Sequence, residues 1–203
     1  MKKLILIVIV FVGLQSSNYA QMVGKDWMSI GWEVGIPSND FISGESYSGG
    51  RIEYQRMIKP HLSVGISGSW NSFQEYVPKS TYQKPDGSGA ITTDLVRELY
   101  SVPLTLTTKY YFNRGGGKKL LPYAGIGLGA QYSAEAIYFN IYGIEDNNWG
   151  FVARPELGLL YALSDHTALY FSATYNSASI KSDFFQHDNL NHTVLSIGFS
   201  FGQ

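Results

Sequence analysis

The sequence predicts an all-β fold, an eight-stranded antiparallel up-and-down transmembrane β-barrel. Three observations lead to this prediction. Eight segments alternate apolar and polar side chains, as strands do when their two faces meet different surroundings. Long polar connections alternate with short ones along the chain. The polar faces consist mostly of Gly, Ser and Thr, and only 15% of the residues are charged.

The N-terminal segment predicts a secretory signal peptide over residues 1–20. Lys2 and Lys3 form a basic start, Leu4–Leu14 is almost wholly apolar, and small residues precede a cleavage point after Ala20. The apolar run is shorter than the ~20 residues that a membrane-spanning helix needs, although a signal anchor or a buried first helix is the alternative. The rest of the chain, residues 21–203, is predicted to be one barrel domain.

Composition excludes several classes of protein. The chain has no cysteine, so disulfide scaffolds and thiolate metal sites are excluded. A formal net charge of −1 gives no basis for nucleic-acid binding. Beyond the N-terminal segment, no apolar stretch approaches the ~20 residues of a transmembrane helix. The class of protein that is left is an exported β-protein, which is either soluble or embedded in the outer membrane.

The first four strands are predicted over Trp27–Ile36, Gly49–Ile58, His61–Phe73 and Leu95–Phe112. In the first, apolar side chains occupy the even positions from Met28 onward, with Ser, Gly or Glu between them. The second places Arg51 and Glu53 on one face. The third and fourth carry mainly Ser and Gly, or Thr and Lys, opposite an apolar face.

The last four strands are predicted over Pro122–Ile137, Gly150–Leu163, Thr167–Ser177 and His192–Phe201. The fifth has glycine at successive positions of its polar face, and the seventh and eighth set Ser, Thr or Gly opposite large apolar residues. The sixth sets Arg154 and Glu156 opposite Leu157 and Leu159. Each of these patterns has the period of two that a strand requires.

The chemistry of the polar faces decides which side meets lipid. A soluble sandwich or a lipocalin-like barrel, the alternative, would turn its apolar face inward and show more Lys and Glu to water. A narrow eight-stranded barrel instead needs small inward side chains. We therefore expect Leu157 and Leu159 to face lipid, and Arg154 and Glu156 to face the lumen.

The connections are expected to be irregular loops at one end and tight turns at the other. The long ones cover residues 37–48, 74–94, 138–149 and 178–191. They are predicted to lie at the cell surface, with the short turns in the periplasm. Two interfacial girdles are expected from aromatic residues near strand ends: Trp27, Trp70, Tyr110, Phe112, Tyr175 and Phe201.

Two prolines test this model, because Pro103 and Pro155 lie inside predicted strands and cannot donate a ladder hydrogen bond. Within lipid, a backbone group that loses its partner finds no water. Each proline therefore requires either a bulge or another donor for the opposite carbonyl.

Four stretches carry a resemblance to a known family: SVPLTLTTKYYF (101–112), LPYAGIGLGAQYS (121–133), ELGLLYALSDHTALYFSATY (156–175) and TVLSIGFSF (193–201). The chain resembles the small outer-membrane β-barrels, meaning the OmpA-like transmembrane domain and PorT-like relatives. The resemblance implies an outer-membrane location among lipid and lipopolysaccharide. It also implies assembly by the barrel-assembly machinery, through a closing strand that ends near Phe201.

Charged residues on the inward face are expected to form a lumen network: Glu33, Arg51, Glu53, Lys109, Glu135, Arg154 and Glu156, with Arg51 and Glu135 nearer the rims. A gate or ion path is one interpretation. A salt-bridged plug is favoured, because buried charges must be paired and eight strands leave no open channel.

The loops offer weak signals for chemistry and a stronger one for binding. Ser182, Asp183, His187, Asp188 and His192 supply the residue types of a hydrolase or a metal site, but their spacing matches no known motif, so no enzyme, metal or cofactor is predicted. Loop aromatics favour an unknown surface ligand: Phe41, Tyr47, Tyr76, Tyr82, Tyr138, Phe139, Tyr142, Trp149, Phe184 and Phe185. The predicted role is structural or surface-interacting, with a narrow pore and a lipid-modifying enzyme as alternatives.

Overall fold

The computed structural model describes residues 26–39, 41–83, 89–112, 119–139, 142–182, 185 and 187–202; the side chains of residues 82, 83 and 91 are not described. The predicted signal peptide over residues 1–20 lies outside these ranges and stays a prediction. Within them, no helix has the length and apolar character needed to cross a membrane.

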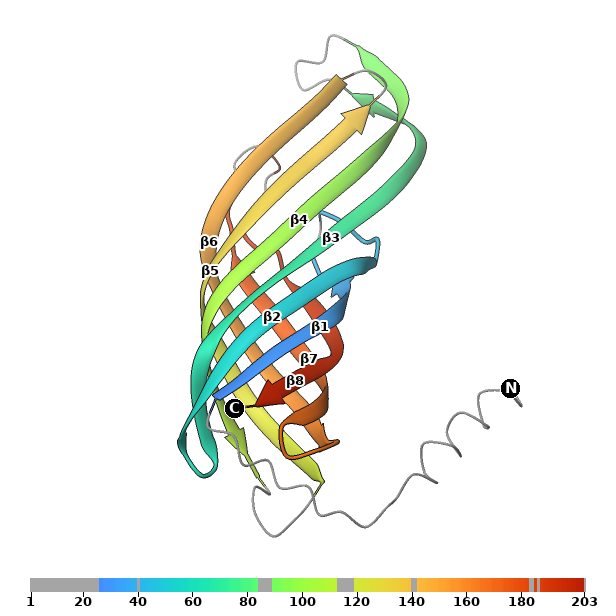
Figure 1. The fold of residues 1–203 in the computed structure, drawn as a ribbon. Helices are drawn as coiled ribbons and strands as arrows, with labels where there is room; N and C mark the ends of the chain where they lie inside the picture. The colour runs from blue at the N-terminus through green and yellow to red at the C-terminus, as the bar shows by residue number, and fades with distance from the viewer. Residues whose placement is uncertain are drawn as a thin grey trace, which may run out of the picture.

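Eight antiparallel strands close into a ring (Figure 1). The strands are β1 (Asp26–Pro37), β2 (Ser46–Lys59), β3 (Leu62–Gln83), β4 (Ala90–Tyr111), β5 (Leu120–Phe139), β6 (Tyr142–Ala162), β7 (Thr167–Ser179) and β8 (His192–Gly202). Each strand pairs with its neighbour in the chain, and β8 pairs with β1 from Trp27↔Gly202 to Pro37↔His192. The predicted up-and-down barrel is confirmed.

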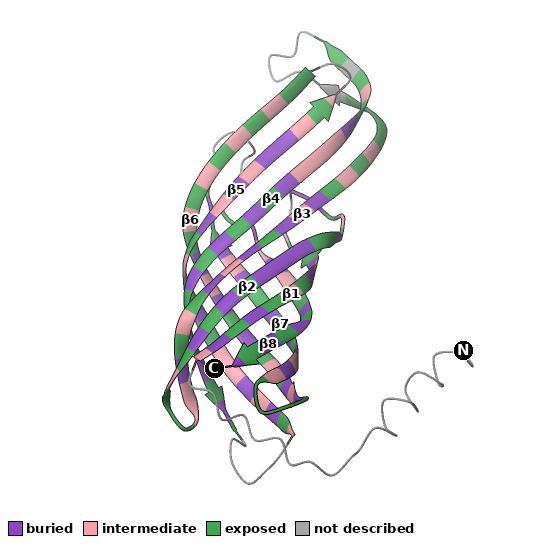
Figure 2. Ribbon diagram, viewed as in Figure 1, coloured by how far each residue is buried: buried purple, intermediate pink, exposed green. Residues whose placement is uncertain are grey.

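Side chains alternate between the two surfaces along every strand, as the banding in Figure 2 shows. Leu157 is 67% exposed on the outer surface, whereas Arg154 and Glu156 are buried in the lumen. The faces expected from the sequence are therefore correct. Trp70, Tyr110, Phe112, Tyr175 and Phe201 are exposed outward, as expected of girdle residues.

Trp27 corrects the expected girdle, because it is only 5% exposed. It lies at an odd position of β1, like Ser29 and Glu33, and strand alternation turns it into the lumen. Its ring lines a small cavity there beside Ser200.

Four strands are longer than the sequence indicated. Residues 74–94 and 138–149 were expected to be loops, but β3–β4 and β5–β6 continue through most of them. The β3–β4 ladder reaches Gln83↔Ala90 and the β5–β6 ladder reaches Phe139↔Tyr142, while β4 and β5 stay paired as far as Val96↔Tyr138. Beyond the barrel wall both faces of these strands meet mostly polar surroundings, so the apolar alternation is lost while backbone pairing continues. We call residues 74–83, 90–98, 134–139 and 142–148 the hairpin extension; Figure 1 shows it rising on one side of the barrel.

The two prolines are accommodated without bulges. The β3–β4 ladder passes from Gly68↔Leu104 to Asn71↔Ser101 with its register unchanged, skipping two pairs, one of which is opposite Pro103. The β6–β7 ladder does the same around Pro155, while Pro155 pairs normally with Ile126 on β5. Each proline thus lacks a bridge on one side only, where it has no N–H to give.

Tyrosine rings on the lumen side lie against glycines of neighbouring strands. A Cβ at Gly198 would fall 2.7 Å from the Tyr170 ring, and Gly31 leaves even less room beside the same side chain. Gly158 is crowded in the same way by Tyr123. These glycines allow bulky rings to fill a narrow lumen without pushing the wall outward.

An arginine at the middle of the outward face tests the membrane orientation of the wall. Leu106 is 71% exposed on β4, between Tyr100 and Tyr110. Leu106→Arg should cost roughly 2–4 kcal/mol of folding free energy in bilayers. Thr92→Arg, on the hairpin extension of the same strand, should cost little. Heat-modifiable gel mobility and urea unfolding in vesicles measure both, and equal stability of the two variants would contradict the face assignment.

Candidate functional site

Buried charged side chains line the lumen of the barrel. Strand alternation turns six charged residues inward: Glu33 from β1, Arg51 and Glu53 from β2, Lys109 from β4, and Arg154 and Glu156 from β6. None of them is more than 6% exposed. Burial at this level requires each charge to find a partner, because desolvation of an unpaired ion is costly.

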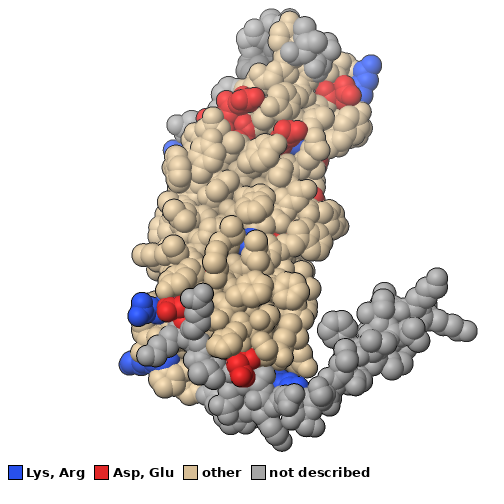
Figure 3. Space-filling view, viewed as in Figure 1, with Lys and Arg blue, Asp and Glu red and all other residues tan. Residues whose placement is uncertain are grey.

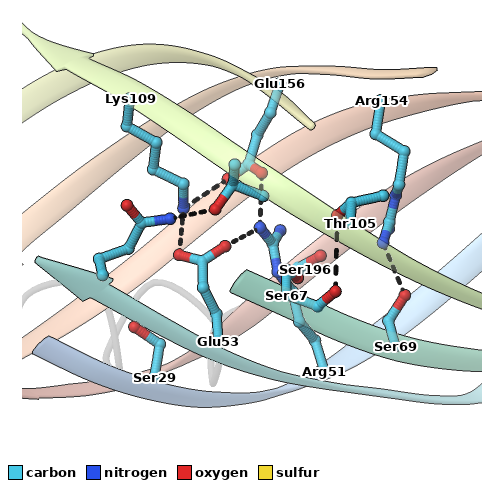
Figure 4. A network of polar contacts seen from close by, with 12 residues as sticks. Ser29, Arg51, Glu53, Ser67, Ser69, Thr105, Lys109, Arg154, Glu156 and Ser196 are labelled. Atoms are coloured by element: carbon cyan, nitrogen blue, oxygen red, sulfur yellow. Dashed lines mark hydrogen bonds and ion pairs between the residues drawn. The ribbon is translucent and has the colours of Figure 1, made fainter. Parts of the chain in front are cut away.

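Arg51 lies at the centre of this group (Figure 4). Its Nη2 pairs with Glu53 and lies 2.6 Å from Oε2 of Glu156, and its Nε donates to Ser67 at 3.2 Å. The expected position of Arg51 nearer a rim is therefore wrong. The tilt of β2 carries this position to the level of Glu156, which is far away in the sequence.

Lys109 completes a closed cycle of charges. Its Nζ pairs with Glu53 and lies 3.2 Å from Oε1 of Glu156, which also accepts a hydrogen bond of 2.6 Å from Tyr123. Arg51, Glu53, Lys109 and Glu156 thus alternate in sign around a ring, which we call the charge quartet. Each carboxylate faces two cations, so the mutual attraction offsets much of the cost of burial.

Arg154 forms a second group beside the quartet. It lies 3.7 Å from Oε1 of Glu33 and donates to Ser69 at 2.8 Å. Glu33 also accepts from Asn71 at 3.0 Å and from Ser196 at 3.1 Å. Across both groups three cations face three carboxylates, so the six charges balance.

Glu135 lies apart from these groups, at the base of the hairpin extension. Its Oε2 is 2.6 Å from Nε2 of His187. Burial raises the pKa of the Glu135 carboxyl. Nearby, hydrogen bonds from Ser182 and Asn148 hold the pKa of Asp146 below its usual range.

The candidate hydrolase residues have other partners. Ser182 donates to Asp146 at 2.6 Å and accepts from the Phe185 amide, while the Nε2 of His187 faces Glu135. His192 is fully buried against the ring of Phe73. Asp183 lies outside the described residues. Among the residues that the structure describes, no three His, Asp or Glu are grouped to hold a metal.

Apolar residues close the lumen at the end that carries the hairpin extension. The hairpin-end cluster consists of Phe41, Ile42, Phe73, Leu99, Val152, Ala178, Ile180 and Leu190, with Ile137 and Phe185 packed against it. The Phe41 and Phe185 rings are 4.9 Å apart, so Phe41 is buried and not the exposed binding residue that the sequence suggested. Ile42, Ile180 and Leu190 were not anticipated; isolated apolar residues in polar loops were the only signal.

A second cluster closes the opposite, short-turn end. The turn-end cluster consists of Tyr111, Leu121, Tyr123, Leu160, Ala168 and Tyr170, with Met57 against it. Between it and the charge quartet lies a cavity of about 20 Å³, which is room for about one water molecule.

The outer surface divides into three zones (Figure 3). The middle of the visible face carries very few charges, while acidic and basic side chains gather toward both ends. Tyr47, Tyr76, Tyr142 and Trp149 are exposed near the hairpin end, as the sequence suggested. The Tyr82 side chain and Phe184 lie outside the described residues.

Closed topology, an apolar outer wall and a charged lumen together describe a membrane barrel. A model of the outer membrane protein beta-barrel domain matches residues 5–202. The chain belongs to this outer membrane β-barrel family. The protein is accordingly located in the outer membrane, with its apolar wall in the lipid bilayer.

Solved structures similar to this outer membrane barrel support the same fold. Neisserial surface protein A (NspA) is 17% identical over 88% of this chain and 97% of its own, with a TM-score of 0.57. OprG of Pseudomonas aeruginosa is 16% identical over 91% and 98%, with a TM-score of 0.50. The protease OmpT of Escherichia coli is 5% identical over 93% and 99%, with a TM-score of 0.50. A search of curated proteins finds no match.

Removing one member of the charge quartet should destabilise this outer membrane barrel strongly. Arg51→Ala leaves Glu53 and Glu156 with Lys109 alone, and should lower the free energy of unfolding by about 3–5 kcal/mol. Arg56, on the same strand, is 64% exposed and lies 3.8 Å from Asp26. Arg56→Ala should therefore change stability by only about 0–1 kcal/mol. Urea unfolding in vesicles compares the two, and similar values would show that the quartet contributes no more than a surface pair.

Proposed function

We propose that this outer-membrane protein is a closed, non-conducting barrel with a structural or surface-interaction role. The observation that carries the proposal is the filling of the lumen at three successive levels: the hairpin-end cluster, the charge quartet and the turn-end cluster. The cavity of about 20 Å³ beside the quartet is too small to continue as a path for hydrated solutes. This arrangement supports the plug over the alternative of a narrow pore.

The hairpin extension supports a role in surface interaction. Its outward face combines tyrosines with acids: Tyr76 donates to Asp94 at 3.1 Å, and Tyr138 donates to Glu145 at 2.9 Å. Rigid aromatic side chains with a polar tip are favoured at binding surfaces. We propose that this face meets lipopolysaccharide or an external ligand, and that the barrel-assembly machinery inserts the protein.

Catalysis has the least support among the alternatives. The side chains of Ser182 and His187 bond to Asp146 and Glu135 and not to each other, so these two candidates do not form a nucleophile–base pair. The protease activity in the name of OmpT belongs to that protein, and its 5% identity carries only the fold to this chain.

Electrical recording tests the closed lumen. The folded protein should show no steady conductance in planar bilayers. Arg154→Ala should also stay silent, because the charge quartet and both clusters remain in place. Steady channels from the unmodified protein would contradict the plug and favour the pore.

Single cysteines test the orientation, since the chain has none of its own. Lys79 is exposed on the hairpin extension and Lys59 at the β2–β3 turn. With the extension at the cell surface, Lys79→Cys should react with a membrane-impermeant maleimide on intact cells. Lys59→Cys, the matched control at the opposite end, should react only after the outer membrane is opened. The reverse pattern would invert the proposed orientation.

A further inference from the structure

The segment between β7 and β8 forms a strap at the base of the hairpin extension. We call residues 180–182, 185 and 187–190 the strap. Its two arms pair with each other, because the Ser182 amide donates to the His187 carbonyl at 3.0 Å and the reverse bond is 3.3 Å. The Leu190 amide donates to the carbonyl of Ala178 at 3.1 Å, which ties the strap to the end of β7. The side chains of Ser182 and His187 then bind β6 and β5.

The strap covers the apolar end of the lumen. Ile180 and Leu190 are fully buried in the hairpin-end cluster, and Phe185 packs against it. These side chains do not titrate, so their burial does not depend directly on pH. Any direct pH dependence of strap docking therefore comes from its polar contacts.

Only one of the two side-chain contacts described above joins two titratable groups. Ser182 donates to Asp146, whose pKa is held below its usual range, so that contact keeps its form at neutral and mildly acidic pH. By contrast, Nε2 of His187 lies 2.6 Å from Oε2 of Glu135, and the two side chains are 9% and 0% exposed. Oε1 of Glu135 has no hydrogen-bond partner in the described chain. So buried a carboxylate depends strongly on the charge opposite it.

The strands that pack against His187 supply acids. Glu135 comes from β5, and Asp146 of β6 is within electrostatic range of the imidazole. The Phe41 ring, whose centroid is 5.8 Å from that of the imidazole, is uncharged. Arg97 of β4 donates to the carbonyl of Phe41 at 3.0 Å. The charged residues of the strap itself are opposite in sign: Lys181 and Asp188.

We propose that Glu135 and His187 form a pH-sensitive latch, which holds the strap closed in mildly acidic surroundings and lets it open more often above neutral pH. Imidazole is the side chain that ordinarily changes its charge between pH 5 and 8. With a protonated ring, the contact is a charge-assisted hydrogen bond, about twice as strong as a neutral one. With a neutral ring, the buried carboxylate keeps a hydrogen bond and loses the opposite charge.

The Glu135 carboxyl adds to the same direction. Burial raises its pKa, so its protonation is easier when the strap is closed. This contribution to closure is present at low pH and is lost as the pH rises through the raised pKa. Both members of the latch therefore favour closure in acid.

Opening of the strap uncovers apolar surface without making a pore. It frees Ile180 and Leu190 from the hairpin-end cluster, while the charge quartet and the turn-end cluster still fill the lumen. With the hairpin extension at the cell surface, the latch responds to the pH outside the cell. That location rests on the orientation proposed above, which the cysteine labelling tests separately.

Hydrogen exchange measures how often the strap opens. Protein folded in lipid vesicles is exchanged at about pH 5.5 and about pH 8, on either side of the range in which imidazole titrates. Mass spectrometry follows the amides of Ser182, His187 and Leu190, which are hydrogen-bonded when the strap is closed. After correction for the pH dependence of the chemical exchange rate, these amides should exchange about tenfold faster at the higher pH.

Two conservative variants remove the charge pair and keep a hydrogen-bonding side chain. His187→Gln and Glu135→Gln should each exchange at nearly the same corrected rate at both pH values. His166→Gln is the matched control, because His166 is exposed in the β6–β7 turn at the opposite end of the barrel. This control should keep the tenfold difference of the unmodified protein.

Three results would overturn the latch. The first is a corrected rate in the unmodified protein that is equal at both pH values, and the second is faster exchange in acid. The third is a pH difference that persists in both glutamine variants, since it would assign the effect to another group. If one of these variants fails to fold, as urea unfolding in vesicles shows, the other supplies the test.

Discussion

Closure of the backbone ladder is the constraint on which the rest of this structure depends. In hydrocarbon an unpaired N–H or C=O finds no water, so β1 must pair with β8 along its whole length. Ring closure with eight strands then fixes a narrow lumen. Pro103 and Pro155 show how closely the rule is kept, since each loses pairing on one side and keeps it on the other.

A narrow lumen explains the chemistry of the inward face. Glycines such as Gly158 and Gly198 give space to the rings of Tyr123 and Tyr170. The remaining volume holds the charge quartet, in which each charge has opposite neighbours at close range. Apolar clusters at both ends keep bulk water away from the quartet and so strengthen its attractions.

The outer surface is less uniform than a simple barrel would require. Four strands extend past the membrane band on one side and present tyrosine–acid pairs there. On the wall formed by β5 to β8, outward apolar side chains around Ala173 line a shallow, open depression.

The sequence by itself determined the strand number, the alternation of faces and the outward position of Leu157, because a period of two and the chemistry of lipid and lumen are local properties. Charged inward residues such as Glu53 and Arg154 could also be predicted from parity. Only the tertiary structure decided their partners, since strand tilt and register bring Arg51 to Glu156 and place Glu135 beside His187. The tertiary structure also decided the length of β3 to β6, because backbone pairing beyond the wall leaves no periodic pattern of side chains in the sequence. It decided the burial of Phe41 for a similar reason, since packing between loops has no sequence period.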